Sequence, residues 1–235
     1  MKQPSQKKAR GVIYVYWGDT VEGELDRSVN SLQRFHSELP FEKIKLENNS
    51  TLLNKARMLE LSPFKTTLFL DTDTMVMDRL DFGFEKAEQH GLACCINECP
   101  WARRYTDIAG DQIEYNTGVL FFTQKAEAVF KRWEEIAHSI NSAMVFFRNE
   151  RILEMPNNDQ AGFSQAVVDT GFNPFVLPLN WNLRPQWQRT FFGPIKVWHD
   201  RSEPPLDLKS WNEDQGLEQS ILKYSGDHPD FSILK

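Results

Sequence analysis

Apolar residues recur along this chain in two alternating spacings. Short runs of β-branched and aromatic residues bounded by glycine, such as GVIYVYW at 11–17, predict strands. Stretches in which apolar residues return every three or four positions, as in Leu25, Val29 and Leu32, predict helices that bury one face. The predicted strands lie at 11–17, 43–47, 66–70, 92–96, 116–122, near 175–178 and at 194–198, and the predicted helices at 24–38, 51–61, 82–90, 125–148 and 158–169.

The order of these elements indicates an α/β fold. Strand, helix, strand, helix, strand over the first third of the chain is typical of a mainly parallel sheet with right-handed crossovers, flanked by helices. Ligands of such sheets bind beyond the carboxyl ends of the strands. We therefore expect a Rossmann-like domain with its site at that edge.

The length of 235 residues suits one domain with a sizeable core. Residues 1–10 carry four basic side chains and are expected to form a flexible tail. The recognisable elements fill 11–200, and the last part, 201–235, is rich in Pro, Asp and Ser and reads as a tail that wraps the domain. We find no internal repeat.

Net charge and cysteine content narrow the function classes. A formal net charge of −6 gives no field for a general nucleic-acid binder, although a nucleotide needs only a local basic pocket. The sequence has no apolar run long enough to span a membrane, and its first apolar run is interrupted too early for a signal peptide. Three cysteines without paired spacing, Cys94, Cys95 and Cys99, indicate free thiols, so we expect a cytoplasmic protein.

The sharpest chemical feature is LFLDTDTMV at 68–76, where an apolar strand runs into Asp71 and Asp73. Two carboxylates at a strand end are costly to hold together unless a cation neutralises them, and hard oxygen ligands favour Mg²⁺ or Mn²⁺ over zinc. A solvated acidic pair is the alternative. The position at the end of a strand favours a metal site.

Five blocks in this order resemble the GT-A-fold glycosyltransferases, especially family 8, the group of glycogenin and the bacterial lipopolysaccharide galactosyltransferases. The blocks are KARMLELSPFKTTLFLDTDTMV at 55–76, YNTGVLFF at 115–122, NNDQAGFSQAV at 157–167, LPLNWN at 177–182 and KVWHD at 196–200. Thr117 replaces a small residue of the family's N-A-G-V strand. The resemblance spans about 11–200 and implies a GT-A domain there.

The resemblance implies a metal-dependent transferase that takes a sugar from a nucleoside-diphosphate donor. Asp71 and Asp73 would bind Mn²⁺ or Mg²⁺, with Asp71 also near the ribose, and His199 would be the third ligand. His199 ends an apolar strand, where ligands converge, although a lone histidine is often a hydrogen-bonded structural residue.

The resemblance also assigns residues to the donor. Lys55 would neutralise the donor and orient the sugar, or else be an exposed helix lysine. Tyr16 and Trp17 would seat the base, with Asp19 at its polar edge, so a UDP-sugar is favoured; packing is the alternative role of the two aromatic residues.

The reacting face would be formed by Asn116, which faces the donor sugar, and by Asp159 and Gln160 on the opposite wall. Asp159 also suits the first turn of a helix. The family retains anomeric configuration, through either a carboxylate nucleophile or front-face return, and the sequence does not choose between them. The acceptor is expected to be a carbohydrate or glycoconjugate.

One departure concerns the diphosphate. The family's K-P-W block is missing after His199, so the charge of its lysine falls to Arg201, Lys196 or Arg184. The loops that would shape the acceptor groove contain three further candidates, Trp101, Trp187 and Arg189, for which packing or plain exposure is equally open.

Three other functions remain open. A haloacid-dehalogenase-like phosphatase also has D-x-D after a strand, but Met75 stands at its threonine position. A sugar-phosphate nucleotidylyltransferase would need a glycine-rich loop after the first strand, which YWGDTVEGE lacks. The third is a catalytically inactive sugar-nucleotide-binding module, which detectable turnover would eliminate.

Overall fold

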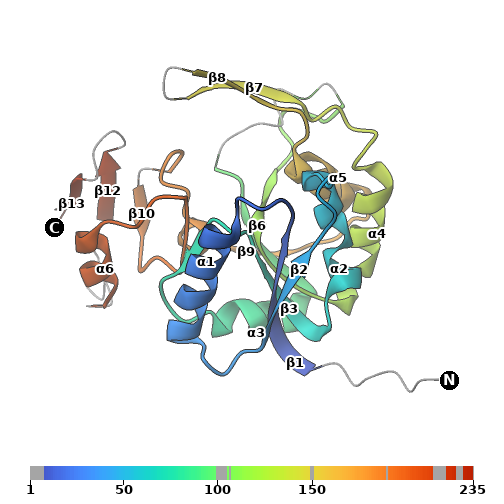
Figure 1. Ribbon diagram of the computed structural model, residues 1–235. Coiled ribbons are helices and arrows are strands. Elements are labelled where there is room, and N and C mark those ends of the chain that lie inside the picture. The colour runs from blue at the N-terminus through green and yellow to red at the C-terminus, as the bar shows by residue number, and fades with distance from the viewer. Residues whose placement is uncertain are drawn as a thin grey trace.

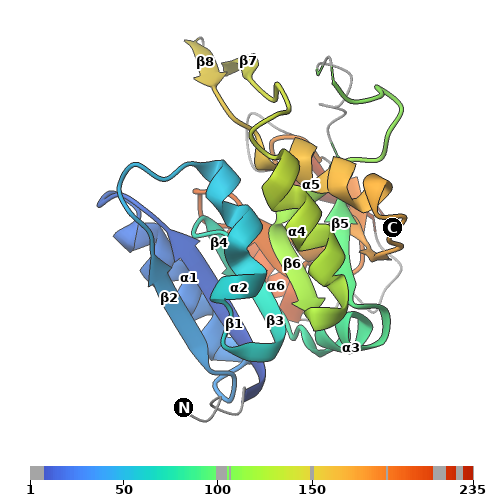
Figure 2. The ribbon, with the colours of Figure 1, turned by 90° about the vertical axis from the view of Figure 1, so that its right-hand side faces the viewer.

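The computed structural model of the protein describes residues 8–98, 105, 107–148, 151–188, 190–213, 221–225 and 230–234. Its central sheet contains β1 (Lys8–Tyr16), β2 (Phe41–Lys45), β3 (Phe64–Leu70), β5 (Leu92–Ile96), β6 (Tyr115–Thr123) and β9 (Phe175–Leu177). The strand order is β2-β1-β3-β6-β5-β9, as Figures 1 and 2 show. Only β6 runs antiparallel to its neighbours in this sheet, so the expected mixed, mainly parallel sheet is confirmed.

Helices cover both faces of the sheet (Figure 2). They are α1 (Glu22–Phe35) and α3 (Asp81–His90) on one face, and the 3₁₀ helix η1 (Leu52–Arg57), α2 (Met58–Leu61), α4 (Glu127–Ile136) and α5 (Asp159–Asp169) on the other. Alternate residues of β1 serve the two faces: Val12 packs in the core under α1, and Ile13 packs in the core under α4. This alternation is what a sheet covered on both sides requires.

Smaller elements surround the carboxyl end of β3. There β4 (Thr74–Val76) pairs antiparallel with β11 (Val197–His199), which brings the C-terminal part of the chain to the two aspartates. The remaining elements are the short helices η3 (Gln124–Ala126) and η4 (Leu179–Asn182), the hairpin β7 (Met144–Arg148) and β8 (Arg151–Met155), α6 (Leu206–Glu213), and a small sheet of β10 (Thr190–Phe192), β12 (Ile221–Ser225) and β13 (Asp230–Leu234).

The predicted helix at 125–148 is wrong in its second half. Helix α4 ends at Ile136, and the chain continues into the β7–β8 hairpin, which projects from the body of the molecule (Figure 1). Met144 is buried and Val145 exposed, which is strand alternation rather than a helical stripe. Polar contacts hold the chain between the helix and the hairpin: the backbone N–H of Asn141 donates to Asp107, and Ser142 accepts from the backbone N–H of Asn158.

Element ends also differ from the predictions. Strand β1 begins at Lys8, inside the expected flexible tail 1–10, and Arg10 in it forms an ion pair with Glu88 at 2.7 Å. The segment predicted as one helix at 51–61 is the 3₁₀ helix η1, which Thr51 caps, followed by the short α2. The described part of 201–235 contains α6, β12 and β13, which the prediction of a wrapping tail lacked.

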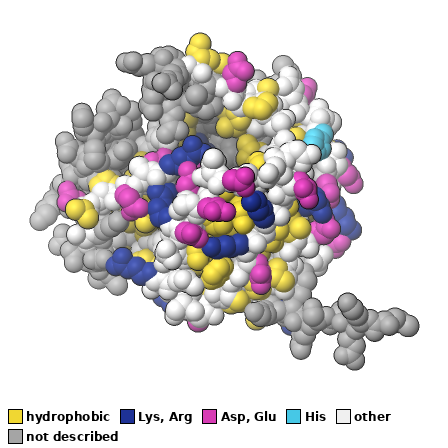
Figure 3. Space-filling model, in the orientation of Figure 1, with side chains coloured by type: hydrophobic (Ala, Val, Ile, Leu, Met, Phe, Trp, Pro, Cys, Tyr) yellow, Lys and Arg dark blue, Asp and Glu magenta, His cyan; other side chains and the backbone are white. Residues whose placement is uncertain are grey.

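The molecular surface is mixed in charge on the face shown in Figure 3, where basic and acidic side chains alternate around α1. The described side chains on this face form no continuous basic stripe for a nucleic-acid backbone. Among the described residues, no helix is long and apolar enough to cross a membrane.

Candidate active site

A cavity of about 370 Å³ lies at the carboxyl end of β3. Six of the described elements contribute to its wall, from η1 in the first third of the chain to β11 near residue 200. It brings together seven of the residues predicted from sequence: Lys55, Asp71, Asp73, Asn116, Asp159, Gln160 and His199.

The predicted metal ligands converge in this cavity. One ligand atom each from Asp71, Asp73 and His199 lies within 4.8 Å of the other two. His199 Nε2 is 3.3 Å from Asp73 Oδ1 and 3.8 Å from Asp71 Oδ2. These contacts are ion pairs if Nε2 carries a proton, and a ligand set if a cation takes the place of that proton. Two carboxylates and one imidazole fit Mn²⁺ well, since Mg²⁺ prefers oxygen ligands alone.

Gly118 makes the approach of His199 to Asp71 possible. A Cβ atom at position 118 would lie 2.3 Å from His199 Cε1 and 2.9 Å from Asp71 Oδ2. The backbone of Gly118 also accepts a hydrogen bond from the Asp71 N–H at 2.9 Å. Strand β6 therefore fixes Asp71 and leaves room for the imidazole next to it.

A buried lysine joins one of the candidate metal ligands to the first turn of α5. Lys55 Nζ is 2.6 Å from Asp71 Oδ1 and 3.2 Å from Asp159 Oδ2, and its side chain is 5% exposed. Thr117 Oγ1 donates to the same Asp159 oxygen at 2.5 Å. The alternative of an exposed helix lysine is thus wrong for Lys55.

The pKa values of these groups follow from burial and neighbouring charge. Burial alone would lower the pKa of Lys55, but Asp159 and Asp71 raise it above its usual value. Burial raises the pKa of Asp71, although Lys55 and His199 act in the opposite direction. Burial would raise the pKa of Asp73 as well, but the charge and hydrogen bond of His199 hold it well below its usual range.

Asp159 and Gln160 occupy the first turn of α5. Asn158 caps this helix, since its side-chain oxygen accepts from the Gln160 N–H at 3.0 Å. Both predicted residues are buried, and Gln160 Nε2 is 3.2 Å from Glu114 Oε1. Helix α5 therefore presents a carboxylate and an amide to the cavity.

The side-chain amide of Asn116 has a hydrogen-bonded oxygen and a nitrogen that no described residue binds. Its side-chain oxygen accepts from the Gly118 N–H and from Asn182 Nδ2, each at 2.8 Å. Its Nδ2 is buried and has no hydrogen-bond partner among the described residues. A buried donor without a partner in a cavity wall is costly, so this amide fits a ligand oxygen.

The residues expected to seat the base lie elsewhere. Tyr16, Trp17 and Asp19 follow or end β1 but do not line the cavity that holds the other seven. Tyr16 packs against the core under α1, and Asp19 forms an exposed ion pair with Lys45 at 2.9 Å. Packing is the role that the structure shows for Tyr16.

The three candidates for the positive charge next to the diphosphate differ in whether they line the cavity. Lys196 is bound to Asp78 at 2.5 Å and does not line the cavity. Arg184 and Arg201 do line it; Arg184 is paired with Glu98 at 3.0 Å, and Arg201 is largely exposed.

Several residues of the cavity wall were not singled out from the sequence. They are Leu52, Thr117, Met144, Met155, Asn158, Gln186 and Asp200. The sequence did mark Thr117 as unusual, because it replaces the small residue of the family's N-A-G-V strand. Of the acceptor candidates, Trp187 lines the cavity, whereas Trp101 and Arg189, like Cys99, lie outside the described residues.

A second acidic cluster, His36, Glu38 and Asp81, is structural. The Leu80 N–H donates to His36 Nε2 at 2.8 Å, so the lone pair of this nitrogen is already used. Arg79 neutralises both Glu38 and Asp81, with N···O distances of 2.9 and 2.7 Å. This cluster ties α1 to the start of α3.

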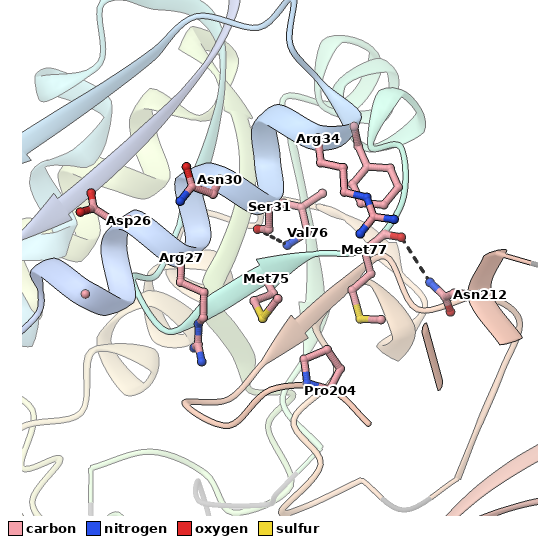
Figure 4. A pocket seen from close by; sticks show the side chains of 12 residues that line it. Asp26, Arg27, Asn30, Ser31, Arg34, Met75, Val76, Met77, Pro204 and Asn212 are labelled. Atoms are coloured by element: carbon pink, nitrogen blue, oxygen red, sulfur yellow. Dashed lines mark hydrogen bonds between the residues drawn. The ribbon is translucent and has the colours of Figure 1, made fainter. Parts of the chain in front are cut away.

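A second cavity contains none of the predicted site residues. It has a volume of about 530 Å³ and lies between α1 and the segment of Met75, Val76 and Met77 (Figure 4). Ser31 and Asn212 hold that segment in place by hydrogen bonds to its backbone. Size alone therefore does not locate the chemistry here.

Comparison with known proteins gives a fold. No family profile and no curated protein sequence matches the chain. Mouse xyloside xylosyltransferase 1 superposes with a TM-score of 0.57 at 12% identity, over 84% of this chain and 99% of that one. The galactosyltransferase LgtC, solved with donor and acceptor sugar analogues, gives 0.53 at 12% identity, over 89% and 94%.

GlyE of Streptococcus pneumoniae gives a TM-score of 0.50 at 14% identity, over 77% of this chain. The chain spans only 48% of the length of GlyE and 40% of that of the bifunctional glycosyltransferase WbbM. The likeness extends over nearly the whole of the two shorter enzymes. The protein therefore has the GT-A-type α/β fold of these glycosyltransferases.

Proposed function

We propose that the protein is a metal-dependent glycosyltransferase that moves a sugar from a nucleoside-diphosphate sugar to an acceptor hydroxyl, with retention of configuration. The observation that carries this proposal is the convergence of Asp71, Asp73 and His199 within 4.8 Å at the edge of a cavity on a glycosyltransferase fold. The named enzymes with this fold support the reaction class, and a UDP-sugar is the favoured donor.

Asp71, Asp73 and His199 would hold Mn²⁺ or Mg²⁺. Such an ion, when bound, offsets the charge that builds on the departing nucleoside diphosphate. Arg184 and Arg201 also line the cavity and would supply further positive charge in place of the missing lysine. The charged part of the donor is thus matched by groups that line this edge.

The opposite wall would orient the sugar. Asn116 offers a buried donor that no described residue satisfies, which suits a sugar hydroxyl. Lys55 and Thr117 both bind Asp159 Oδ2 and hold this carboxylate in one orientation. Asp159 and Gln160 then bound the face of the sugar that is turned away from Asp73.

The test is release of nucleoside diphosphate from a panel of nucleotide sugars, with Mn²⁺ or with a chelator. Asp73→Asn removes one ligand charge, and Asp78→Asn is the matched control, because Asp78 pairs with Lys196 outside the cavity. We expect Mn²⁺-dependent turnover of one donor that Asp73→Asn abolishes and Asp78→Asn preserves.

Two other results would contradict the proposal. Donor binding without any turnover, with a broad panel of acceptors, would indicate a binding module. Release of inorganic phosphate from phosphate esters would favour the phosphatase.

A further inference from the structure

The metal-ligand function proposed for His199 requires one ring nitrogen to be free of a proton. Each neutral imidazole carries one proton, on either Nδ1 or Nε2, and the partner of the second nitrogen decides which. Nε2 faces Asp73 and Asp71, and Nδ1 lies 2.7 Å from Asn182 Oδ1.

The direction of the hydrogen bonds behind His199 can be derived from a backbone group. The Gly118 N–H can only donate, so the atom of Asn116 that it meets at 2.8 Å is the side-chain oxygen. The same oxygen is 2.8 Å from the Asn182 side chain, which must therefore direct its NH₂ group there. The other end of Asn182, facing His199, is consequently its oxygen.

An amide oxygen can only accept, so Nδ1 of His199 must carry the proton. We infer that Asn182 is a positioning residue: it holds the Nδ1 proton of His199 and thereby leaves Nε2 as the nitrogen that binds the cation beside Asp71 and Asp73. This inference rests on the proposed metal-dependent function.

The surroundings support a fixed arrangement. Asn182 is 2% exposed and does not line the cavity, so it acts through His199 rather than on a substrate. Backbone hydrogen bonds join its helix η4 to β11: Leu183 donates to Val197 at 2.9 Å, and His199 donates to Leu183 at 2.8 Å. Partners of this kind orient metal-binding histidines in many proteins, and their loss weakens metal affinity.

His36 provides an internal comparison. There a backbone N–H occupies Nε2, which leaves Nδ1 as the protonated nitrogen beside Glu38. At His199 the backbone donor is the Gly118 N–H, which reaches the imidazole through the side chains of Asn116 and Asn182, and Nε2 remains directed at two carboxylates. The Nδ1-protonated tautomer therefore has a structural role in His36 and a metal-binding role in His199.

The first measurement is the ¹⁵N spectrum of histidine-labelled protein at mildly alkaline pH, with His199 assigned by its absence in His199→Gln. We expect Nδ1 of His199 to carry a proton in the wild type. An unprotonated Nδ1 would overturn the inference without any variant of Asn182.

The second measurement is the Mn²⁺ dissociation constant of three variants, each checked for folding by thermal unfolding. Asn182→Leu has the volume but no acceptor and should bind Mn²⁺ about 10- to 100-fold more weakly than the wild type. Asn182→Asp keeps an acceptor for Nδ1 and should recover most of that loss. Asn180→Ala is the control, because Asn180 lies in the same helix and bonds to the Pro194 carbonyl instead.

Failure of this inference and failure of the proposed function give different results. Wild-type Mn²⁺ affinity in a folded Asn182→Leu variant would overturn the inference. A protonated Nδ1 in a wild-type protein that binds no Mn²⁺ would uphold the hydrogen-bond chain and contradict the proposed function instead.

Discussion

Gly118→Ala is the smallest change that should separate the proposed metal ligands. The added Cβ would lie 2.3 Å from His199 Cε1, 2.8 Å from Nδ1 and 2.9 Å from Asp71 Oδ2. Non-bonded carbon atoms approach to about 3.5–4.0 Å, so the imidazole must recede by more than about 1 Å. Gly118 is not among the described glycines with positive φ, so alanine adds a clash and not backbone strain.

The expected cost is larger for function than for stability. A displacement of about 1 Å at a reacting site costs about 100-fold in rate, and we expect a loss of that order in Mn²⁺-dependent turnover. Overpacking of this kind destabilises a protein by about 1–3 kcal/mol, which leaves the variant folded at room temperature if overall stability is ordinary. The assay combines Mn²⁺ titration, turnover and urea unfolding on one preparation.

Gly23→Ala is the matched control. Position 23 is exposed on α1, and a Cβ there would meet nothing within 4 Å. Alanine in a helix is favoured over glycine by about 0.5–1 kcal/mol, so this variant should be slightly more stable and fully active. If Gly118→Ala binds Mn²⁺ and turns over as the wild type does, His199 and Asp71 are not held together as described.

Three further predictions concern the buried groups. Lys55→Met leaves Asp71 and Asp159 without their buried cation and should lower the free energy of unfolding by about 3–5 kcal/mol. Lys43→Met breaks a half-exposed pair with Asp26 and should lower it by less than about 1 kcal/mol. Equal urea midpoints for the two variants would refute this prediction. Asp159→Asn should reduce transfer by about 100-fold or more with Mn²⁺ affinity intact, and Thr117→Val should act in the same direction more weakly; unchanged turnover in Asp159→Asn would exclude a chemical role. Burial raises the pKa of the Cys94 and Cys95 thiols, so a Cys99→Ser variant should resist alkylation when it is folded. Mass spectrometry should show two labels after alkylation of the unfolded variant. Rapid labelling of the folded variant would contradict the buried position of β5.

The sequence was most informative where a local pattern and a tertiary role coincide. Strand β3, which Asp71 and Asp73 follow, is buried at every position except Lys65, as its apolar run predicts. Strand β5 has the predicted bounds for the same reason. Seven of the predicted site residues meet because the strand ends and the helix start that carry them are recognisable from sequence.

Local pattern failed where distant contacts decide. Ile140 and Met144 continue the helical spacing of α4, yet Ser142 bonds to Asn158 and the chain turns into a hairpin. Lys196, a candidate for the diphosphate charge, is paired with Asp78 instead. The role of Tyr16, Trp17 and Asp19 toward a base stays a prediction. The link from Asn182 to His199 joins residues 17 positions apart, and no spacing rule announces it.

The most direct test of the account is a calorimetric titration of the protein with a panel of nucleotide sugars, with and without Mn²⁺, on the wild type and on Asp73→Ala. We expect one donor to bind only when Mn²⁺ is present and to lose that binding in the variant. Donor binding that is equally tight without Mn²⁺, or in Asp73→Ala, would contradict the central claim that Asp71, Asp73 and His199 form the metal site of a glycosyltransferase.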